Sequence, residues 1–202
     1  NPSIIHISKE MQDELDIADN DLTSKEFLDF VTGNHVIDGS KPFAMCYAGH
    51  QFGNWAGQLG DGRAINLGEI NNWAIQLKGA GPTPYSRSAD GLALSLTGDE
   101  VLRDVMYNGN SDYEKGAIVS RVAKSFLRFG NFEIFAARND IKNLKVLIDY
   151  TIKTHFSELG TPNKETYLKF FQEVTNRTLE MIIHWQRVGF VHGVMNTDNM
   201  SI

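Results

Sequence analysis

The segment from residue 167 to residue 185 restricts the possible folds of this chain more than any other stretch. Its apolar residues recur every three or four positions, which places them on one face and predicts a long amphipathic helix. Asn163 precedes the segment as a candidate N-cap, and Gly189 follows it as a candidate end. We expect the apolar stripe to be part of a core and not a cofactor site. Its members are Leu168, Phe171, Val174 (or Thr175), Leu179, Ile182 and Ile183.

The residues after this helix, 188–202, combine a short apolar approach with a polar loop. Asn196, Asp198 and Asn199 supply carboxylate and amide oxygens, the ligands that hard cations such as Mg²⁺ take. The loop resembles the catalytic loop of protein kinases, where an Asp base precedes a metal-binding Asn. However, Val194 stands where the kinase base would be. Because Asn and Asp are also common in turns, a turn without chemistry is the alternative interpretation.

Composition places limits on the kinds of protein this chain can be. At 202 residues, with 42% apolar and 22% charged residues, it can bury a core as one large domain or two small lobes. A net charge of −6 argues against a nucleic-acid partner. The single cysteine, Cys46, excludes an internal disulfide and fits a cytoplasmic protein. No apolar run is long enough to span a membrane. The first residues show no targeting signal, and we expect a fragment.

The front half is predicted to be rich in β-structure after a polar, acidic arm. The arm comprises residues 1–34, with short helices expected to begin at Ser8 and Ser24, which could serve as N-caps. Residues 82–87 are predicted to form an extended connector, and residues 97–99 a turn. The predicted strands cover residues 64–67, 73–78, 92–96 and 117–122.

A candidate phosphate-binding segment precedes the strand that ends at Lys78. Gly60 and Gly62 would let a ligand approach the backbone closely, and Arg63 adds a fork-shaped cation. A glycine hairpin can also be purely structural. In the N-lobe of kinases, a glycine hairpin is followed by a strand whose Lys holds the α- and β-phosphates. This order of parts favours a nucleotide-binding role for Lys78.

Two arginines, Arg121 and Arg128, lie seven residues apart with Lys124 between them. On a strand this spacing places the arginines on opposite faces, and on a helix it places them on one face. They could be surface residues, or they could line an anion pocket in an otherwise acidic protein. Both interpretations stay open at this point.

The order of these parts predicts an α+β protein with two lobes and a nucleotide between them. We expect an N-terminal arm (1–34), a β-rich nucleotide-binding lobe (35–130) and a helical lobe (131–202) that carries the catalytic loop and is incomplete. The interpretation requires Lys78, Arg121, Arg128 and Asn199 to face a common cleft.

Four segments together resemble the selenoprotein O family, the bacterial YdiU-type proteins. They cover residues 47–70, 73–87, 121–138 and 189–202, in the family's order. The resemblance implies a protein-kinase-like fold that binds ATP in a flipped orientation. It also implies transfer of AMP, not phosphate, to Ser, Thr or Tyr hydroxyls of target proteins.

The same resemblance implies roles for individual residues. Asp198 matches the proton acceptor, and Asn199 matches a ligand of Mg²⁺ or Mn²⁺. The positions that match the family's nucleotide contacts are Gly60, Gly62, Arg63, Lys78, Asp90, Gly91, Arg121 and Arg128.

Two parts of the family pattern are not found in this chain. One is an Asp-Tyr-Gly motif with a further metal ligand, and the other is a helical Glu that pairs with the lysine. We expect residues to be missing near Gly91 and Leu92, with a second such place between residues 70 and 73. If the gene itself lacks these parts, a catalytically inactive, nucleotide-binding pseudokinase scaffold is the alternative function. A phosphotransferase is the other alternative.

Overall fold

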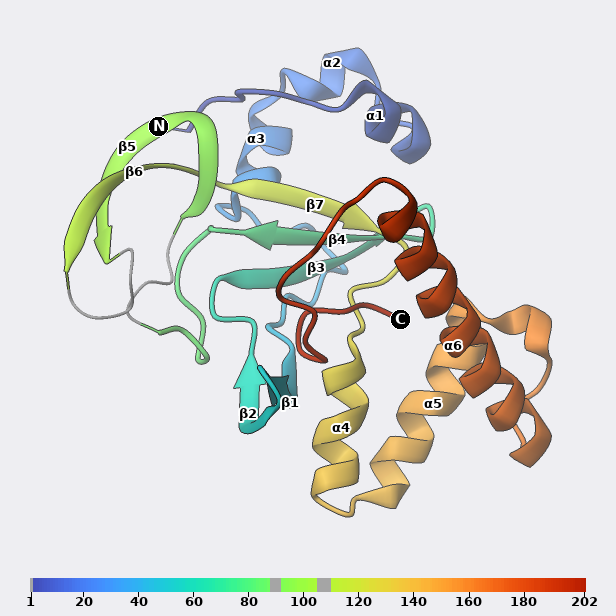
Figure 1. Ribbon diagram of the computed structural model, residues 1–202. Helices are drawn as coiled ribbons and strands as arrows, with labels where there is room; N and C mark the ends of the chain where they lie inside the picture. Colours follow the sequence, from blue (N-terminus) through green and yellow to red (C-terminus); the bar gives the residue numbers. More distant parts are fainter. Residues whose placement is uncertain (1, 88–91, 105–109) are drawn as a thin grey trace. The chain divides into compact units, whose positions relative to one another are not determined.

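The computed structural model describes residues 2–87, 92–104 and 110–202. The chain is α+β and divides into two compact units (Figure 1). The first unit contains residues 1–46 and 60–124, and the second contains residues 47–59 and 125–202. The predicted boundaries of the arm and the two lobes stay a prediction.

Three short helices form the N-terminal part of the first unit. The Ser8 hydroxyl accepts a hydrogen bond from the Met11 N–H, and the Ser24 hydroxyl accepts one from the Phe27 N–H, so both predicted N-caps are confirmed. Leu15 packs with the apolar face of the neighbouring sheet, which makes this segment part of the core. The helices are α1 (Lys9–Leu15), α2 (Asp19–Leu22) and α3 (Lys25–Thr32).

A three-stranded antiparallel sheet forms the centre of the first unit, with β4 between β3 and β7 (Figure 1). Ile70 and Trp73 are paired, and Asn71 and Asn72 between them both have positive φ, as a two-residue hairpin turn requires. A two-residue turn therefore joins β3 and β4, and the expectation that residues are missing between 70 and 73 stays a prediction. The strands are β3 (Ala64–Ile70), β4 (Trp73–Lys78) and β7 (Val119–Ala123).

One face of this sheet is apolar and forms the core of the first unit. Ile75 and Leu77 of β4 pack there with Leu67 of β3 and with Leu15. Because side chains alternate along a strand, the residues between them point to the opposite face. That opposite face carries the polar residues described below.

The rest of the first unit corrects three predictions. β5 (Ala93–Asp104) continues through the predicted turn at 97–99 and pairs with β6 (Ser111–Ala117). Leu94 and Asp99 both lie opposite Gly116, so the residues between them are accommodated as an irregularity within the strand. The predicted strand at 117–122 is divided between β6 and β7.

The connector 82–87 is not extended. The Ser86 N–H donates to the Thr83 carbonyl oxygen over 3.1 Å, which closes a turn. Pro84 occupies the second position of this turn, where its fixed φ is favourable. The proline that suggested an extended segment therefore favours a turn instead.

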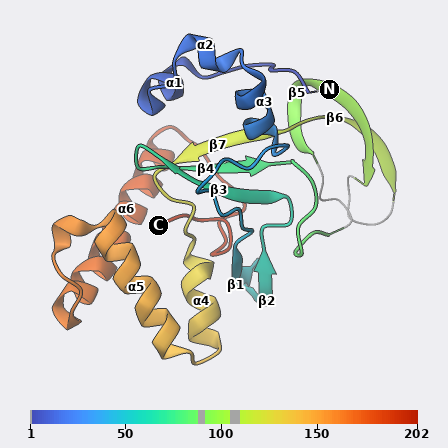
Figure 2. The same ribbon diagram turned by 180° about the vertical axis from the view of Figure 1, so that it is seen from behind.

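The second unit combines a hairpin with three longer helices, and β1 lies beside α4 (Figure 2). Ile152, Phe156 and Phe170 form its core, with the rings of Phe156 and Phe170 in an edge-on contact at 5.0 Å. The elements are β1 (Cys46–Gln51), β2 (Asn54–Gly60), α4 (Phe129–Ala137), α5 (Ile141–His155), the 3-10 helix η1 (Ser157–Leu159) and α6 (Lys164–Arg187).

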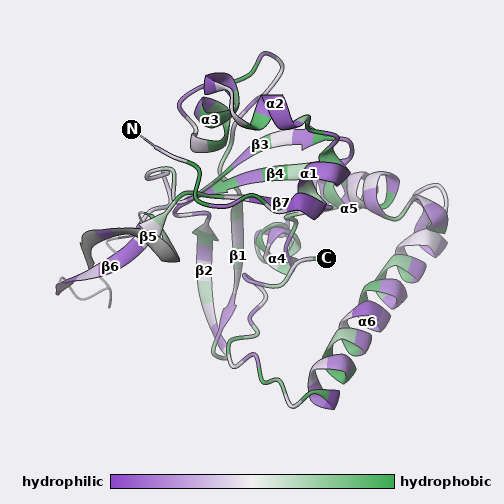
Figure 3. Ribbon diagram, turned by 90° about the horizontal axis from the view of Figure 1, so that it is seen from above, coloured by the Kyte–Doolittle hydropathy of each residue, from purple (hydrophilic) through white to green (hydrophobic). Residues whose placement is uncertain are grey.

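The long helix α6 is confirmed, including its N-cap. The Asn163 side-chain oxygen accepts hydrogen bonds from the N–H groups of Glu165 and Thr166. Hydrophobic residues occur along the whole helix (Figure 3). None of the described helices is both long enough and apolar enough to cross a membrane.

The expectation that the apolar stripe of α6 packs in a core is wrong for most of its members. The core cluster reaches the helix at Tyr167, Phe170 and Val174, which lie in its first half. A helix of 24 residues is about 36 Å long, so Leu179 and Ile183 lie in turns past this small cluster. Leu168 and Phe171 lie in the first half of the helix but outside the face that contacts the cluster. The exposed members are Leu168 (66% exposed), Phe171 (73%), Leu179 (56%) and Ile183 (47%).

Candidate functional site

A row of polar side chains crosses the first unit's sheet on the face opposite its apolar core. In the strand register, Asn66 of β3 lies opposite Gln76 of β4, and Gln76 lies opposite Arg121 of β7. Directly opposed residues point to the same face of a sheet. Lys78 lies two residues beyond Gln76 and therefore shares this face. Two predicted nucleotide ligands, Lys78 and Arg121, are thus brought to one face of one sheet.

Hydrogen bonds connect this row into a buried network. Arg121 Nη1 donates to Gln76 Oε1 over 2.9 Å. Gln76 Nε2 donates to Asn66 Oδ1 over 3.2 Å and to Asp61 Oδ2 over 3.5 Å. Gln76 is fully buried, and Asp61 and Asn66 are nearly so. Buried polar groups of this kind need such partners, since an unpaired group loses its hydration without compensation.

The predicted glycine segment packs against the 83–86 turn. A Cβ added to Gly60 would lie 2.3 Å from Cγ of Tyr85, so only glycine fits beneath this ring. The Thr83 hydroxyl donates to the Asp61 carbonyl oxygen over 2.6 Å, and the Ser86 hydroxyl donates to the Gly62 carbonyl oxygen. A hydrogen bond with Cys46 raises the pKa of the Tyr85 phenol above its ordinary value. Packing against Tyr85 therefore requires glycine at position 60, whether or not Gly60 also binds phosphate.

The prediction that these glycines form a hairpin is wrong. The segment joins β2 to β3, and these two strands belong to different sheets. The hairpin turn lies earlier, where Phe52 and Gly53 connect β1 to β2 with positive φ angles of 52° and 80°. Arg63 Nη1 lies 3.4 Å from the Leu92 carbonyl oxygen.

Arg121, Lys124 and Arg128 lie neither on one continuous strand nor on one helix, the two arrangements considered from their spacing. Arg121 lies in β7, whereas Arg128 is the N-cap of α4, so the chain changes structure between them. The Lys124 ammonium lies 3.5 Å from the centre of the Trp73 ring, and the Arg128 guanidinium lies 4.4 Å from the centre of the Tyr47 ring. Each cation is therefore placed by an individual contact.

In the second unit, the predicted catalytic loop is attached to the start of α4 by backbone hydrogen bonds. The Gly130 N–H donates to the Thr197 carbonyl oxygen over 2.9 Å, and the Phe129 N–H donates to the Met200 carbonyl oxygen over 3.1 Å. Arg128 and Ser201 form an antiparallel bridge at the same place. These bonds fix the loop to a rigid element.

The turn of the β1–β2 hairpin holds the same loop from another side. The His50 N–H donates to the Thr197 hydroxyl oxygen over 3.0 Å. The Thr197 hydroxyl in turn donates to Glu133 Oε2 of α4 over 2.7 Å. The Phe52 N–H donates to Asn196 Oδ1 over 3.2 Å. The loop is therefore held by side chains as well as by the backbone.

The carboxylate of Asp198 has two oxygens in different environments. Gln51 Nε2 donates to Oδ2 over 2.7 Å. The other oxygen, Oδ1, is buried and has no hydrogen-bond partner among the residues that the structure describes. Since an unsatisfied buried oxygen costs free energy, it is a candidate for an interaction with a ligand. Asp198 is thus positioned by one oxygen and left with acceptor capacity on the other.

The donor chemistry of the loop fits a hard cation such as Mg²⁺. Asn199 Oδ1 accepts from the Asn196 N–H over 2.9 Å, and its Nδ2 donates to the Val194 carbonyl oxygen over 2.7 Å, which leaves a second lone pair on Oδ1. Within the described residues, no group of three or more His, Cys, Asp or Glu side chains could hold a metal ion. Mg²⁺ is commonly bound by one or two carboxylates together with phosphate and water, so two oxygen donors suffice from the protein.

The predicted site residues are distributed over both units. Asp90 and Gly91 lie outside the described residues. Gly60, Gly62, Arg63, Lys78 and Arg121 belong to the first unit, and Arg128, Asp198 and Asn199 belong to the second.

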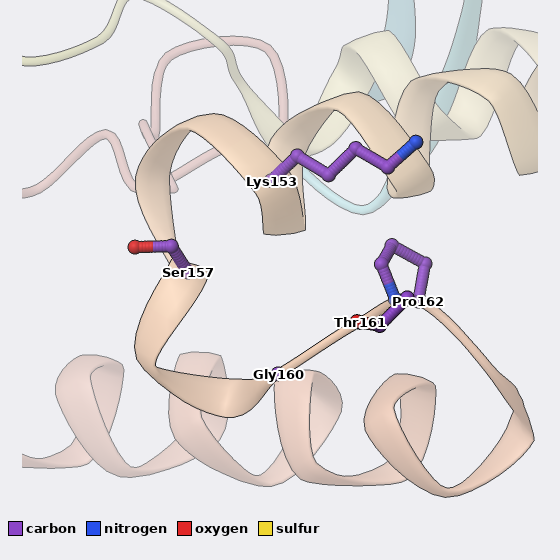
Figure 4. Close-up of a pocket in the computed structure, with 5 residues that line it drawn as sticks. All are labelled: Lys153, Ser157, Gly160, Thr161 and Pro162. Atoms are coloured by element: carbon purple, nitrogen blue, oxygen red, sulfur yellow. The ribbon is translucent and has the colours of Figure 1, made fainter.

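A hollow of about 290 Å³ lies elsewhere, at the end of α5 and before α6 (Figure 4). It contains none of the predicted residues. Its lining consists of Lys153, Ser157, Gly160, Thr161 and Pro162.

Two glutamines in this arrangement were not predicted from the sequence. Gln76 lies between the apolar residues Ile75 and Leu77 in β4. A polar residue at such a position could have indicated a buried hydrogen bond. Gln51 gave no comparable signal, because its partner Asp198 is 147 residues away in the chain.

Comparison with known proteins places these observations in a family. The family model described as protein adenylyltransferase SelO matches residues 1–106 and 92–202. A protein nucleotidyltransferase YdiU of Flavobacterium johnsoniae is 54% identical over 233 aligned positions, which cover 100% of this chain and 45% of that protein. A protein of the same name from Rhodopirellula baltica is 50% identical over 238 positions and is covered to 44%. The chain spans less than half the length of these relatives.

The alignment also shows that relatives have residues this chain lacks. The alignment with the Flavobacterium protein has 233 positions and the chain has 202 residues, a difference of 31. The two matches of the family model overlap between residues 92 and 106. The alignment length agrees with the expectation that relatives have residues this chain lacks, and their place near Leu92 stays a prediction. With matches that together cover its whole length, the chain belongs to the protein adenylyltransferase SelO family.

Proposed function

We propose that the full-length protein containing this chain is a protein adenylyltransferase that transfers AMP from ATP to Ser, Thr or Tyr hydroxyls of target proteins. Family membership supports nucleotidyl transfer, and the names of the relatives support protein substrates. One structural observation carries the proposal for this chain. Asp198 has one carboxylate oxygen held by Gln51 and the other buried without a partner among the described residues. This arrangement suits a group that must accept a proton in a fixed place.

In the proposed reaction, a target hydroxyl attacks the α-phosphorus of ATP and gives its proton to the Asp198 carboxylate. A bond forms between the hydroxyl oxygen and the α-phosphorus, and the bond to the leaving oxygen of pyrophosphate breaks. Charge increases on the phosphate oxygens during this step, so cations placed beside them lower the barrier. Lys78 and Arg121, which share one face of the sheet, would supply such charge. Arg128 would do so from the second unit.

The remaining assignments complete the proposal. Asn199 would hold Mg²⁺ or Mn²⁺ together with oxygens of the nucleotide phosphates, and the bound cation would neutralise phosphate charge. The fold would be a kinase-like pair of lobes. A net charge of −6 favours protein targets over nucleic acid, and the single cysteine favours the cytoplasm. The other nucleotide contacts would come from Gly60, Gly62, Arg63, Asp90 and Gly91.

The test of this function is a labelling experiment with the full-length protein and ATP carrying ³²P at either the α- or the γ-position. We expect protein labelling from the α-labelled ATP alone, because AMP contains only the α-phosphate. Lys78→Ala is expected to reduce labelling about 10- to 100-fold, since a charge-assisted contact is lost. Lys115→Ala, which changes an exposed strand lysine of the same unit, is the control and should label normally.

Two outcomes of this experiment would contradict the proposal. Labelling from the γ-position would indicate a phosphotransferase. ATP binding without transfer of either label would indicate an inactive scaffold.

A Gln51→Met variant is expected to lower kcat about 10-fold and to leave KM for ATP nearly unchanged. The substitution keeps the length of the side chain but removes the hydrogen bond to Asp198, and bonds to charged groups contribute about 1.5–3 kcal/mol. Steady-state kinetics measure both constants. Gln186→Met, on the exposed side of α6, serves as the matched control. A change confined to KM would show that Gln51 contributes to nucleotide binding and not to the position of Asp198.

A further inference from the structure

We propose that Gln76 is a positioning residue that sets the direction of the Arg121 guanidinium without neutralising its charge. The inference rests on the proposed function, because it takes Arg121 as a ligand of the ATP phosphates. It assigns a role to a residue that lies in the middle of β4 and that touches neither solvent nor, in the proposal, the substrate.

The chemistry of the partners fixes the orientation of the Gln76 amide. A guanidinium can only donate hydrogen bonds, so the oxygen of the amide must face Arg121. The NH₂ group then faces Asn66 Oδ1 and Asp61 Oδ2. Asn66 is oriented in turn, because its Nδ2 donates to the Phe43 carbonyl oxygen over 3.3 Å. The network therefore has one consistent direction, from Arg121 through Gln76 to Asp61 and Asn66.

The neutral side chain at position 76 has a specific consequence for charge. A carboxylate at the same distance would pair with Arg121 and reduce its attraction for phosphate. The amide oxygen of Gln76 accepts one N–H of the planar fork and thereby orients it, and a neutral amide brings no negative charge of its own. The glutamine thus orders the cation through a neutral acceptor.

Strand register holds this arrangement in place. Gln76 and Arg121 are directly opposed residues of β4 and β7, and Lys78 lies on the same face two residues along β4. A shift of one residue in either strand would move one partner to the apolar face. The contact is therefore built into the sheet and does not depend on a mobile loop.

A double-mutant cycle on the full-length protein tests the inference, with ATP affinity measured by titration calorimetry. Gln76→Met and Gln76→Glu are each expected to weaken ATP binding about 5- to 50-fold, whereas adenosine binding changes less than two-fold. Arg121→Ala alone should weaken ATP binding at least as much. Adding Gln76→Met to Arg121→Ala should cause less than a two-fold further change, because Gln76 acts through the missing guanidinium.

Two variants, Gln12→Met and Gln76→Glu, separate positioning from a general loss of stability. Gln12 is also a buried glutamine of the first unit, and its Nε2 donates to the Ile17 carbonyl oxygen and to Asp19. Gln12→Met should lower thermal stability without changing ATP affinity. Gln76→Glu keeps the size of the native side chain, so it supplies the measurement if Gln76→Met does not fold.

Three results would overturn the inference. If the effects of Gln76→Met and Arg121→Ala add, Gln76 does not act through Arg121, although Arg121 itself remains a phosphate ligand. If adenosine binding falls as much as ATP binding, the role of Gln76 is structural. If Arg121→Ala leaves ATP affinity unchanged, the assignment of Arg121 in the proposed function fails as well.

Discussion

An Asp198→Asn variant of the full-length protein is expected to transfer AMP about 10²- to 10⁴-fold more slowly than the native protein. The substitution keeps the shape of the side chain but removes its ability to take a proton from the target hydroxyl. The amide introduced at position 198 also carries an oxygen, which can accept the hydrogen bond from Gln51 Nε2. The loop should therefore keep its conformation. The rate of labelling from α-³²P-ATP at saturating ATP measures the effect, and Asp198→Ala should give a loss at least as large.

The control for this prediction is Asp38→Asn, which changes an exposed aspartate in a turn of the first unit and should leave the rate unchanged. Retention of more than about one-tenth of the native rate in Asp198→Asn would exclude Asp198 as the proton acceptor. Attention would then move to Glu133, since it reaches the same loop through Thr197. Gln51→Met should reduce the AMP-transfer rate less than Asp198→Asn does, because Gln51 only positions the group that accepts the proton.

A Gly130→Ala variant is expected to destabilise the second unit by about 3 kcal/mol. An added Cβ at this position would lie 2.1 Å from the Ala48 carbonyl oxygen, and the close neighbour is backbone that cannot rotate away. The same residue donates its N–H to the Thr197 carbonyl oxygen, so any movement of α4 displaces the loop that carries Asp198. Thermal unfolding followed by circular dichroism should show a lower Tm, by roughly 10–20 °C.

Gly39→Ala is the matched control for Gly130→Ala. Gly39 has a positive φ of 90° and nothing within 4 Å of an added Cβ, so the change costs only the strain of the left-handed backbone, about 1–2 kcal/mol. The AMP-transfer rate of Gly39→Ala should be native. If Gly130→Ala is no less stable than Gly39→Ala, the close packing of β1 against α4 is not what holds the loop.

Local sequence signals identified three helix caps, the strand at 73–78 and the long helix α6 correctly. Ser8, Ser24 and Asn163 are N-caps because each reaches N–H groups only two or three residues ahead. The strand at 73–78 was predicted with its boundaries, since its alternation separates an apolar face from a polar one. These features depend on neighbours within one turn or one strand, so the residues themselves contain the information.

The predictions that failed depended on what a segment packs against. The stripe of α6 has the right periodicity for a core helix, yet its second half has exposed apolar residues such as Leu179 and Ile183. The irregularity at 95–98 lies within one strand because β6 pairs with residues on both sides of it. A single sequence gives the face of an element but not its partner.

By itself, the sequence determined the long helix α6, the strand at 73–78, the caps, and the residue types that point to nucleotide chemistry at Lys78, Asp198 and Asn199. Only the tertiary structure decided which oxygen of Asp198 is held by Gln51 and that Gln76 orients Arg121. These pairs are separated by 147 and 45 residues, so strand pairing and chain crossing bring them together. The physical reason is that hydrogen bonds across strands depend on register, and register is a property of how whole segments pack.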